Sequence, residues 1–132
     1  MKMGSRARKR IRDEAYRRFR DAMIVEVGRC EMAAYDGTLH RARMPLSTLQ
    51  IHHIMRGTRR ERSLTERCAI LVLCDECHCK LHTGRKHWPE ASQLALLKLV
   101  RPLEYSLEKY NRLFAGPANR ITEADVDKWA NR

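Results

Sequence analysis

The sequence predicts a small α+β domain with additional helices on both sides, and three observations support this prediction. Two short β-prone runs, residues 48–54 and 69–73, stand on either side of a polar loop. A helical segment follows the second run directly and carries cysteines and histidines at close spacing. Helical patterns fill both flanks, so we expect a basic N-terminal helix or arm at 1–27, a core at 28–84 and a C-terminal helical extension packed on that core at 85–132.

The composition points to a nucleic-acid partner. The 132 residues carry a formal net charge of +11, which indicates a polyanion and favours nucleic acid over an anionic membrane. No apolar run approaches the ~20 residues that a membrane-spanning helix needs, and the basic N-terminus is followed by an amphipathic pattern that differs from a signal peptide. We therefore expect a cytoplasmic protein, in which the five cysteines are metal ligands or buried thiols.

The N-terminal segment combines high charge with a helical pattern. Residues 1–20 contain nine Lys or Arg. Apolar residues recur at the spacing of one helical face, namely Ile11, Ala15, Phe19, Ala22 and Met23. Gly28 is expected to end this helix. Two interpretations of its arginines remain open, a solvated helix face and an arm that contacts phosphates.

The middle of the chain alternates turns with short elements. Residues 35–37 look like a turn, and Pro45 argues against a central strand around it. Residues 56–67 are polar and arginine-rich, with a glycine inside, which favours a loop. Residues 69–73 are apolar, as in a buried strand, and the helix that begins near Cys74 is expected to end at residues 83–84.

The C-terminal third is expected to be helical and supportive. One helix begins near Trp88 and Pro89, and a second follows the break at Pro102, with Leu103 first on its apolar face. Residues 116–117 end that helix, and residues 122–125 resemble a capping box that opens a third. These helices complete the core or form a dimer face.

Metal-ligand residues are concentrated in two short windows. Three of the five cysteines and four of the six histidines lie in residues 52–53 and 74–82. His78 and His82 are four residues apart, so on a helix they share one face and can hold a single cation. Cys74 and Cys77 have the Cys-x2-Cys spacing with which two thiolates reach one tetrahedral zinc ion.

His52 and His53 form a second part of the pattern. Neighbouring side chains on a strand point to opposite faces, so both reach one site only at a twisted strand end. One imidazole can then complete a three-histidine cation site while the other stays metal-free as a base. An unperturbed imidazole pKa near ~6.5 suits that role.

The order strand, loop, strand and Cys-x2-Cys-His-x3-His helix resembles the HNH endonuclease family over residues 28–84. That resemblance implies a ββα-metal core. It also implies that His53 is the general base, that His52, His78 and His82 bind the catalytic cation, and that Cys74 and Cys77 form one half of a structural zinc site.

Two positions depart from the family pattern. Ala69 occupies the place of the family's middle Asn, which is thought to brace the loop and the strand that carries the base. Zinc-containing members usually supply a second, upstream Cys-x2-Cys, whereas only Cys30 is present here. Cys68 is a poor fourth ligand, because five extended residues would hold it roughly 20 Å from Cys74. The zinc site is therefore completed by Cys79, His40 or water, or it is lost.

The resemblance implies a metal-dependent endonuclease that nicks DNA or cuts both strands and leaves 5′-phosphate and 3′-hydroxyl ends. The catalytic cation would be Mg2+, Mn2+, Ni2+ or Zn2+, with a structural Zn2+ in addition. The arginines expected to clamp the phosphate backbone are Arg56, Arg59, Arg60 and Arg62. Two other interpretations remain, a cleavage-impaired HNH-like module that binds DNA or a partner, and an unrelated zinc-finger-type domain.

The expected partner is DNA, with no membrane. A homodimer and a phage or packaging partner protein are further partners that the sequence leaves open. A small free-standing chain with basic flanks favours a phage or mobile-element nuclease over a restriction or repair component.

Overall fold

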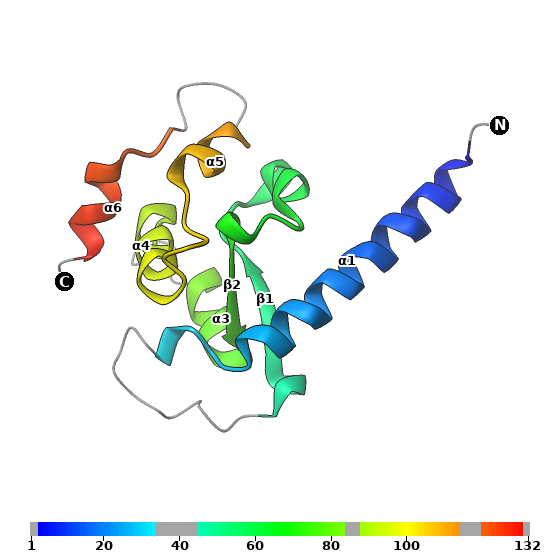
Figure 1. Cartoon of the computed structure of the whole chain (residues 1–132), viewed down its shortest axis with the longest axis horizontal. Helices are drawn as coiled ribbons and strands as arrows, with labels where there is room; N and C mark the ends of the chain where they lie inside the picture. The colour runs from blue at the N-terminus through cyan, green and yellow to red at the C-terminus, as the bar shows by residue number, and fades with distance from the viewer. Residues whose placement is uncertain (1–2, 34–44, 84–87, 114–119, 131–132) are drawn as a thin grey trace.

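The computed structural model of the chain describes residues 3–33, 45–83, 88–113 and 120–130 (Figure 1). Its helices and strands, in order, are α1 (Ser5–Val27), β1 (Leu49–His53), β2 (Ile70–Cys74), α3 (Asp75–Thr83), α4 (Glu90–Val100), α5 (Leu107–Arg112) and α6 (Glu123–Ala130). Within these described ranges, 3-10 helices cover Leu46–Thr48, Gly57–Ser63 and Arg67–Ala69. The α+β class is confirmed, whereas the expected turns at 35–37 and 116–117 lie outside the described residues.

β1 and β2 form a two-stranded antiparallel sheet at the centre of the molecule. The register pairs Leu49 with Cys74 and His53 with Ile70. Every residue of β2 is buried, which agrees with its continuous apolar run. Because β2 leads directly into α3, the end of the sheet lies beside the start of the cysteine- and histidine-bearing helix (Figure 1).

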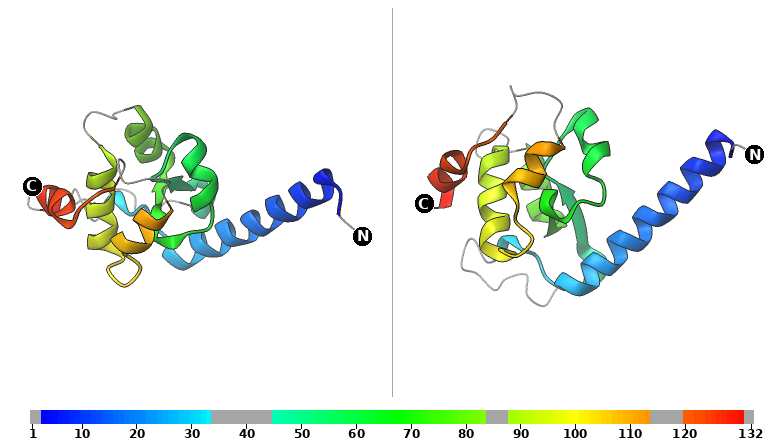
Figure 2. Two further views of the ribbon diagram at one scale, coloured as in Figure 1. Left: turned by 90° about the horizontal axis from the view of Figure 1, so that it is seen from above. Right: turned by 45° about the horizontal axis from the view of Figure 1, so that its top comes forward.

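Helix α1 packs on the sheet with its C-terminal half, while its N-terminal half projects away from the body of the molecule (Figures 1 and 2). As predicted, Gly28 ends the helix: its φ is 69°, and its N–H donates to the Ile24 carbonyl at 2.7 Å. The apolar spacing along α1 does not produce one continuous buried face. Met23 is buried but Ile11 is 55% exposed, because the projecting half has no core beneath it.

One hydrophobic core includes side chains from all three predicted segments. Met23 of α1, Leu73 of β2 and Leu97 of α4 belong to it, together with Tyr110 of α5 and Val126 of α6. The C-terminal helices therefore share one core with the central sheet.

The C-terminal helices confirm one prediction in detail and correct another. Thr122 and Asp125 form the predicted capping box, in which the Asp125 N–H donates to Thr122 Oγ1 at 3.2 Å and the Thr122 N–H donates to Asp125 Oδ2 at 2.9 Å. The expectation that Leu103 belongs to an apolar helical face is wrong, because residues 102–104 form a turn and its side chain is fully exposed. Helix α5 starts only at Leu107.

The segment at 56–67 is more ordered than the expected loop. Residues Gly57–Ser63 form a 3-10 helix, and Gly57 adopts a left-handed φ of 62° at its start. This helix lies between β1 and β2 in the chain, and its Arg60 contacts His53 at the end of β1. Within the part of the chain that the structure describes, no helix is both long and apolar enough to cross a membrane.

Candidate metal centres

The structure brings His52, His78 and His82 together, and we call these three residues the histidine cluster. His52 comes from β1, and the other two come from α3. One ligand nitrogen of each ring lies within 4.8 Å of the others, and the His78 and His82 ring centroids are 4.4 Å apart. The i, i+4 spacing on α3 places the latter two rings on one face, opposite the end of β1. These are the three residues that the resemblance assigned to the catalytic cation.

Two nitrogens of the histidine cluster lack a partner, and both fit a cation. His52 Nδ1 and His78 Nδ1 are buried and accept or donate no hydrogen bond among the described residues. A buried polar atom without a partner costs free energy. A cation between the rings would supply the missing partner, since neutral imidazole nitrogens are common ligands of divalent metals.

Gln93 of α4 fixes the orientation of the His52 ring. Gln93 Oε1 lies 2.6 Å from His52 Nε2, and Gln93 Nε2 donates to the Trp88 carbonyl at 2.9 Å. Because the amide oxygen can only accept, His52 Nε2 carries the proton and Nδ1 presents its lone pair to the cluster. In metal-binding histidines, the ring nitrogen that does not bind the metal regularly donates a hydrogen bond to an oxygen acceptor in the same way.

Burial keeps two rings of the cluster, His52 and His78, in the neutral form that binds a metal. The pKa of His52 is lowered to about 4, chiefly by burial and to a smaller extent by the neighbouring His78 and His82, while the hydrogen bond with Gln93 opposes the shift. Burial, followed by the proximity of His82, also lowers the pKa of His78. Rings that stay neutral at physiological pH offer lone pairs without first releasing a proton.

His53, the predicted general base, lies beside the cluster but outside it. Its Nε2 donates to the Leu64 carbonyl at 3.1 Å, so its Nδ1 carries the lone pair. The Arg60 Nε–H contacts that Nδ1 at 3.3 Å. Burial lowers the pKa of His53, and Arg60 and His78 add to the effect. The unprotonated form that a base needs is therefore favoured.

A cleft of 470 Å³ opens over these groups, and we call it the histidine cleft. Its lining includes His53, His78 and His82, and also Arg56 and Arg60. Arg56 donates one amino group to the Leu81 carbonyl at 3.0 Å. Its Nη1 is buried and has no hydrogen-bond partner among the described residues. Arginine N–H groups in such a cleft can bind a phosphate.

The four predicted phosphate-contacting arginines differ in position. Arg56 and Arg60 line the histidine cleft. Arg59 does not, and its guanidinium donates to Glu90 at 2.5 Å. Arg62 is exposed on the same 3-10 helix and does not line the cleft. Only two of the four, Arg56 and Arg60, therefore lie in the cleft beside the histidine cluster.

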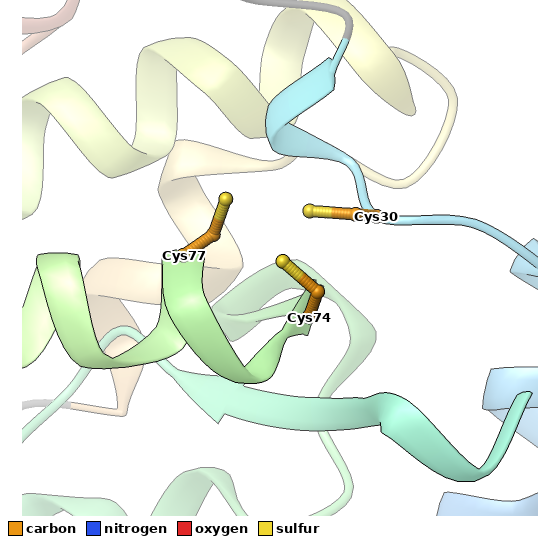
Figure 3. Close-up of side chains that lie close together, drawn as sticks. All are labelled: Cys30, Cys74 and Cys77. Atoms are coloured by element: carbon orange, nitrogen blue, oxygen red, sulfur yellow. The ribbon is translucent and has the colours of Figure 1, made fainter. Parts of the chain in front are cut away.

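Cys30, Cys74 and Cys77 form a second group, which we call the thiol cluster. Figure 3 shows their sulfur atoms pointing toward one another from the segment after α1, the end of β2 and the first turn of α3. The three sulfurs lie within 4.8 Å of one another, and all three residues are buried. Three converging thiols are a suitable donor set for zinc.

Two of the three thiols, Cys77 and Cys30, are held protonated when no metal is bound. The pKa of Cys77 is raised to about 12, chiefly by burial and also by its contacts with Cys74 and Cys30. Burial likewise raises the pKa of Cys30. Zinc binding would release these protons, so its affinity would depend on pH.

The fourth ligand of the thiol cluster is not among the described protein groups near it. Cys79, one of the predicted candidates, is exposed and does not join the cluster. Cys68 is buried but separate from it, as expected from its distance along the chain. His40 lies outside the described residues. Of the predicted alternatives, His40, water and loss of the site therefore stay predictions.

Glu31 places Cys30 against the other two thiols. Its backbone N–H donates to the Val72 carbonyl at 2.8 Å, and its carboxylate accepts from the Val72 N–H at 2.8 Å. The residue thus occupies the edge of β2 that β1 leaves open. Arg101 Nε donates to the second oxygen of the Glu31 carboxylate at 2.8 Å. This ion pair compensates the buried negative charge of Glu31.

The sequence interpretation missed Gln93, Glu31 and Arg101. Each acts through a partner more than forty positions away in the chain, so no local spacing could reveal it. A weak signal existed for Gln93, because it is a polar residue inside an otherwise apolar helix. Comparison of the chain with protein-family models, with curated proteins and with solved structures found no match.

Proposed function

We propose that the protein is a metal-dependent endonuclease of the HNH type that hydrolyses phosphodiester bonds in DNA. The observation that carries this proposal is the histidine cluster with a fourth, metal-free histidine beside it in an arginine-lined cleft. A site built only to hold a metal has no use for His53. A hydrolytic site needs such a base near its cation.

His53 would take a proton from the attacking water through Nδ1. The Leu64 carbonyl holds Nε2–H and thereby fixes both the ring orientation and the tautomer. Arg60 must leave Nδ1 when the substrate enters, and a phosphate oxygen is a stronger acceptor for its guanidinium. A divalent cation held by His52, His78 and His82 would stabilise the negative charge that develops on the phosphate and on the leaving oxygen.

The absence of the family Asn at Ala69 is offset by other hydrogen bonds. Ser63 is fully buried, and its hydroxyl donates to the Arg60 carbonyl at 3.0 Å. The Ser63 carbonyl accepts a hydrogen bond from the Glu66 N–H at 3.1 Å, and the Glu66 carbonyl accepts one from the Ala69 N–H at 2.9 Å. This chain of bonds braces the segment whose Leu64 carbonyl orients the base.

A cleavage-impaired module that binds DNA or a partner protein is the second candidate. The observation that favours it is the Arg60 contact, because a guanidinium on Nδ1 occupies the lone pair that a general base needs. In that case His53 would be a structural residue. The wild type would not cleave DNA, and replacing His53 would leave DNA binding intact.

A plasmid-nicking assay separates the two candidates. Supercoiled DNA is incubated with wild type and with His53→Ala in Mg2+, Mn2+, Ni2+ or Zn2+. The proposal predicts relaxed or linear product with wild type in at least one cation and a loss of ~10³-fold or more with His53→Ala, the size typical of a general base together with its positioning role. Intact plasmid in every cation, or equal cutting by both proteins, would overturn it.

A further inference from the structure

The molecule has a second groove, which leads into the histidine cleft. It has a volume of 720 Å³ and runs between α1 and β1, so we call it the α1 groove. Tyr16, Arg20 and Ile24 of α1 form one of its walls. Three residues line both the α1 groove and the histidine cleft, namely Gln50, Ile51 and Arg60. The two hollows therefore adjoin one another along β1 and meet at Arg60.

Helix α1 carries a strong excess of positive charge over its N-terminal two thirds. Between Ser5 and Arg20 it has eight Lys or Arg against two acidic residues. Five of these cations make no ion pair with any described residue, namely Arg6, Arg8, Lys9, Arg10 and Arg17. Crowded like charges with no counter-charge repel one another, and a polyanion relieves that repulsion.

Part of this charge faces the groove. The Tyr16 ring centroid lies 5.9 Å from that of His53, so this face of α1 is directed at the catalytic base. At 100° per residue, Lys9, Arg12 and Arg20 lie within about 40° of Tyr16 around the helix axis. Arg12 also reaches Glu61 of the 3-10 helix at 3.9 Å. Arg20 itself lines the groove and pairs with Asp21 at 3.2 Å, while Lys9 and Arg12 extend the same face of the helix beyond the groove toward the N-terminus. We call Lys9, Arg12 and Arg20 the groove-facing row.

We infer that the groove-facing row, continued by Arg60, binds the phosphodiester backbone of a nucleic acid and leads it into the histidine cleft. The row is about 16 Å long at 1.5 Å per residue, which corresponds to about five steps of 3.4 Å along a nucleic-acid strand. The row places three cations along that length, and Arg60 adds a fourth where the α1 groove meets the histidine cleft. The inference rests on the proposed function for the nature of the polymer, but it concerns binding and not cleavage.

The test compares two triple variants that remove the same charge from different faces of α1. The first is Lys9→Ala, Arg12→Ala and Arg20→Ala. The matched control is Arg10→Ala, Arg17→Ala and Arg18→Ala, whose side chains lie about 100° to 200° away from Tyr16 around the axis. Alanine favours the helix, so both variants should keep α1, and circular dichroism checks this. All proteins carry His53→Ala to prevent cleavage.

Binding is measured by fluorescence anisotropy with labelled 20-nucleotide probes, one duplex and one single-stranded, over a range of salt concentrations. We expect the first triple to weaken binding of at least one probe by about 10-fold or more near 0.1 M salt and to reduce the salt slope on duplex DNA by about 2 to 3. The control triple should weaken binding less than about 3-fold. The probe with the larger loss identifies the form of nucleic acid that the row takes.

Equal weakening by the two triples would overturn the inference, because the effect would then come from net charge and not from the groove-facing row. An unchanged affinity in the first triple, or no binding of either probe by the parent protein, would also overturn it. Because this test does not measure cleavage, binding through the row by the His53→Ala protein, together with a wild type that fails to nick plasmid, would contradict the proposed function alone.

Discussion

The thiol cluster and the histidine cluster are built from the same short stretch of chain, yet they have opposite surroundings. All three thiols are buried, whereas the histidine cluster runs from the fully buried His52 to the exposed His82 and opens into a cleft. Structural zinc sites are closed, and catalytic metal sites keep a position open for water or substrate. Under the proposed function, the first cluster would therefore hold a structural metal and the second a catalytic one.

The largest effect that this comparison predicts is on stability, at Cys74. Replacing Cys74 by Ser removes a ligand of the thiol cluster at the junction of β2 and α3. Since the free energy of a structural zinc site is folding free energy, we expect loss of bound zinc and destabilisation by about 4 kcal/mol or more. Zinc analysis and thermal melting measure the two effects.

Cys79→Ser is the matched control for that change. Cys79 lies on the same helix but is exposed and outside the cluster, so its replacement should change neither zinc content nor melting temperature. A Cys74→Ser protein with normal zinc content and normal stability would show that the thiol cluster is only a packed group of buried cysteines.

The next effect is on activity, at His82. As the exposed member of the histidine cluster, it contributes little to the core. We expect His82→Ala to lower nicking by about 10³-fold, which equals about 4 kcal/mol of transition-state stabilisation, while the melting temperature changes by less than a few degrees. Lys80→Ala, an exposed neighbour on α3, should alter neither quantity. A large loss of stability in His82→Ala would remove the distinction between the clusters.

A smaller effect is expected at Gln93, which orients His52. Gln93→Leu removes the acceptor for His52 Nε2–H, so the ring can adopt the wrong tautomer. We predict a fall of about 10- to 100-fold in the affinity of the histidine cluster for Mn2+, measured by calorimetry on protein whose thiol cluster is already loaded with zinc. Gln93→Glu keeps the acceptor and should retain affinity. If both variants bind Mn2+ as wild type does, Gln93 has no role in the site.

The smallest effect is expected at Ser63, which braces the segment that orients His53. Ser63→Ala removes its hydrogen bond to the Arg60 carbonyl, a contribution of about 1 kcal/mol. We therefore expect a several-fold lower kcat with KM nearly unchanged, because the base and not the binding surface is loosened. Thr65→Ala, an exposed change in the same segment, serves as the control. A change in KM alone would contradict this role.

The sequence predicted the parts of both sites that depend on local spacing. The helical separation of His78 and His82 and the Cys-x2-Cys spacing are properties of one element, α3, so they could be recognised without a structure. The two strands were predicted to within a residue or two at each end, because a buried apolar run and turn residues mark them.

Other features depend on contacts between distant segments and could not be predicted. Gln93 reaches His52 from α4, and Glu31 pairs with Arg101 across seventy positions. Burial along α1 could not be predicted for the same reason. The apolar spacing is helical, but nothing packs beneath the N-terminal half of the helix, so Ile11 is exposed. Periodicity predicts a helix, whereas burial depends on what packs against it.

One measurement tests the central claim most directly: the zinc content and nicking activity of one sample after dialysis against a mild chelator. The different surroundings of the two clusters predict that about one zinc per chain is retained by the buried thiols. Nicking should be lost and should return when a divalent cation is added back to the open histidine cluster. Loss of all zinc with unchanged nicking, or nicking that the chelator does not affect, would contradict the division between a structural and a catalytic metal centre.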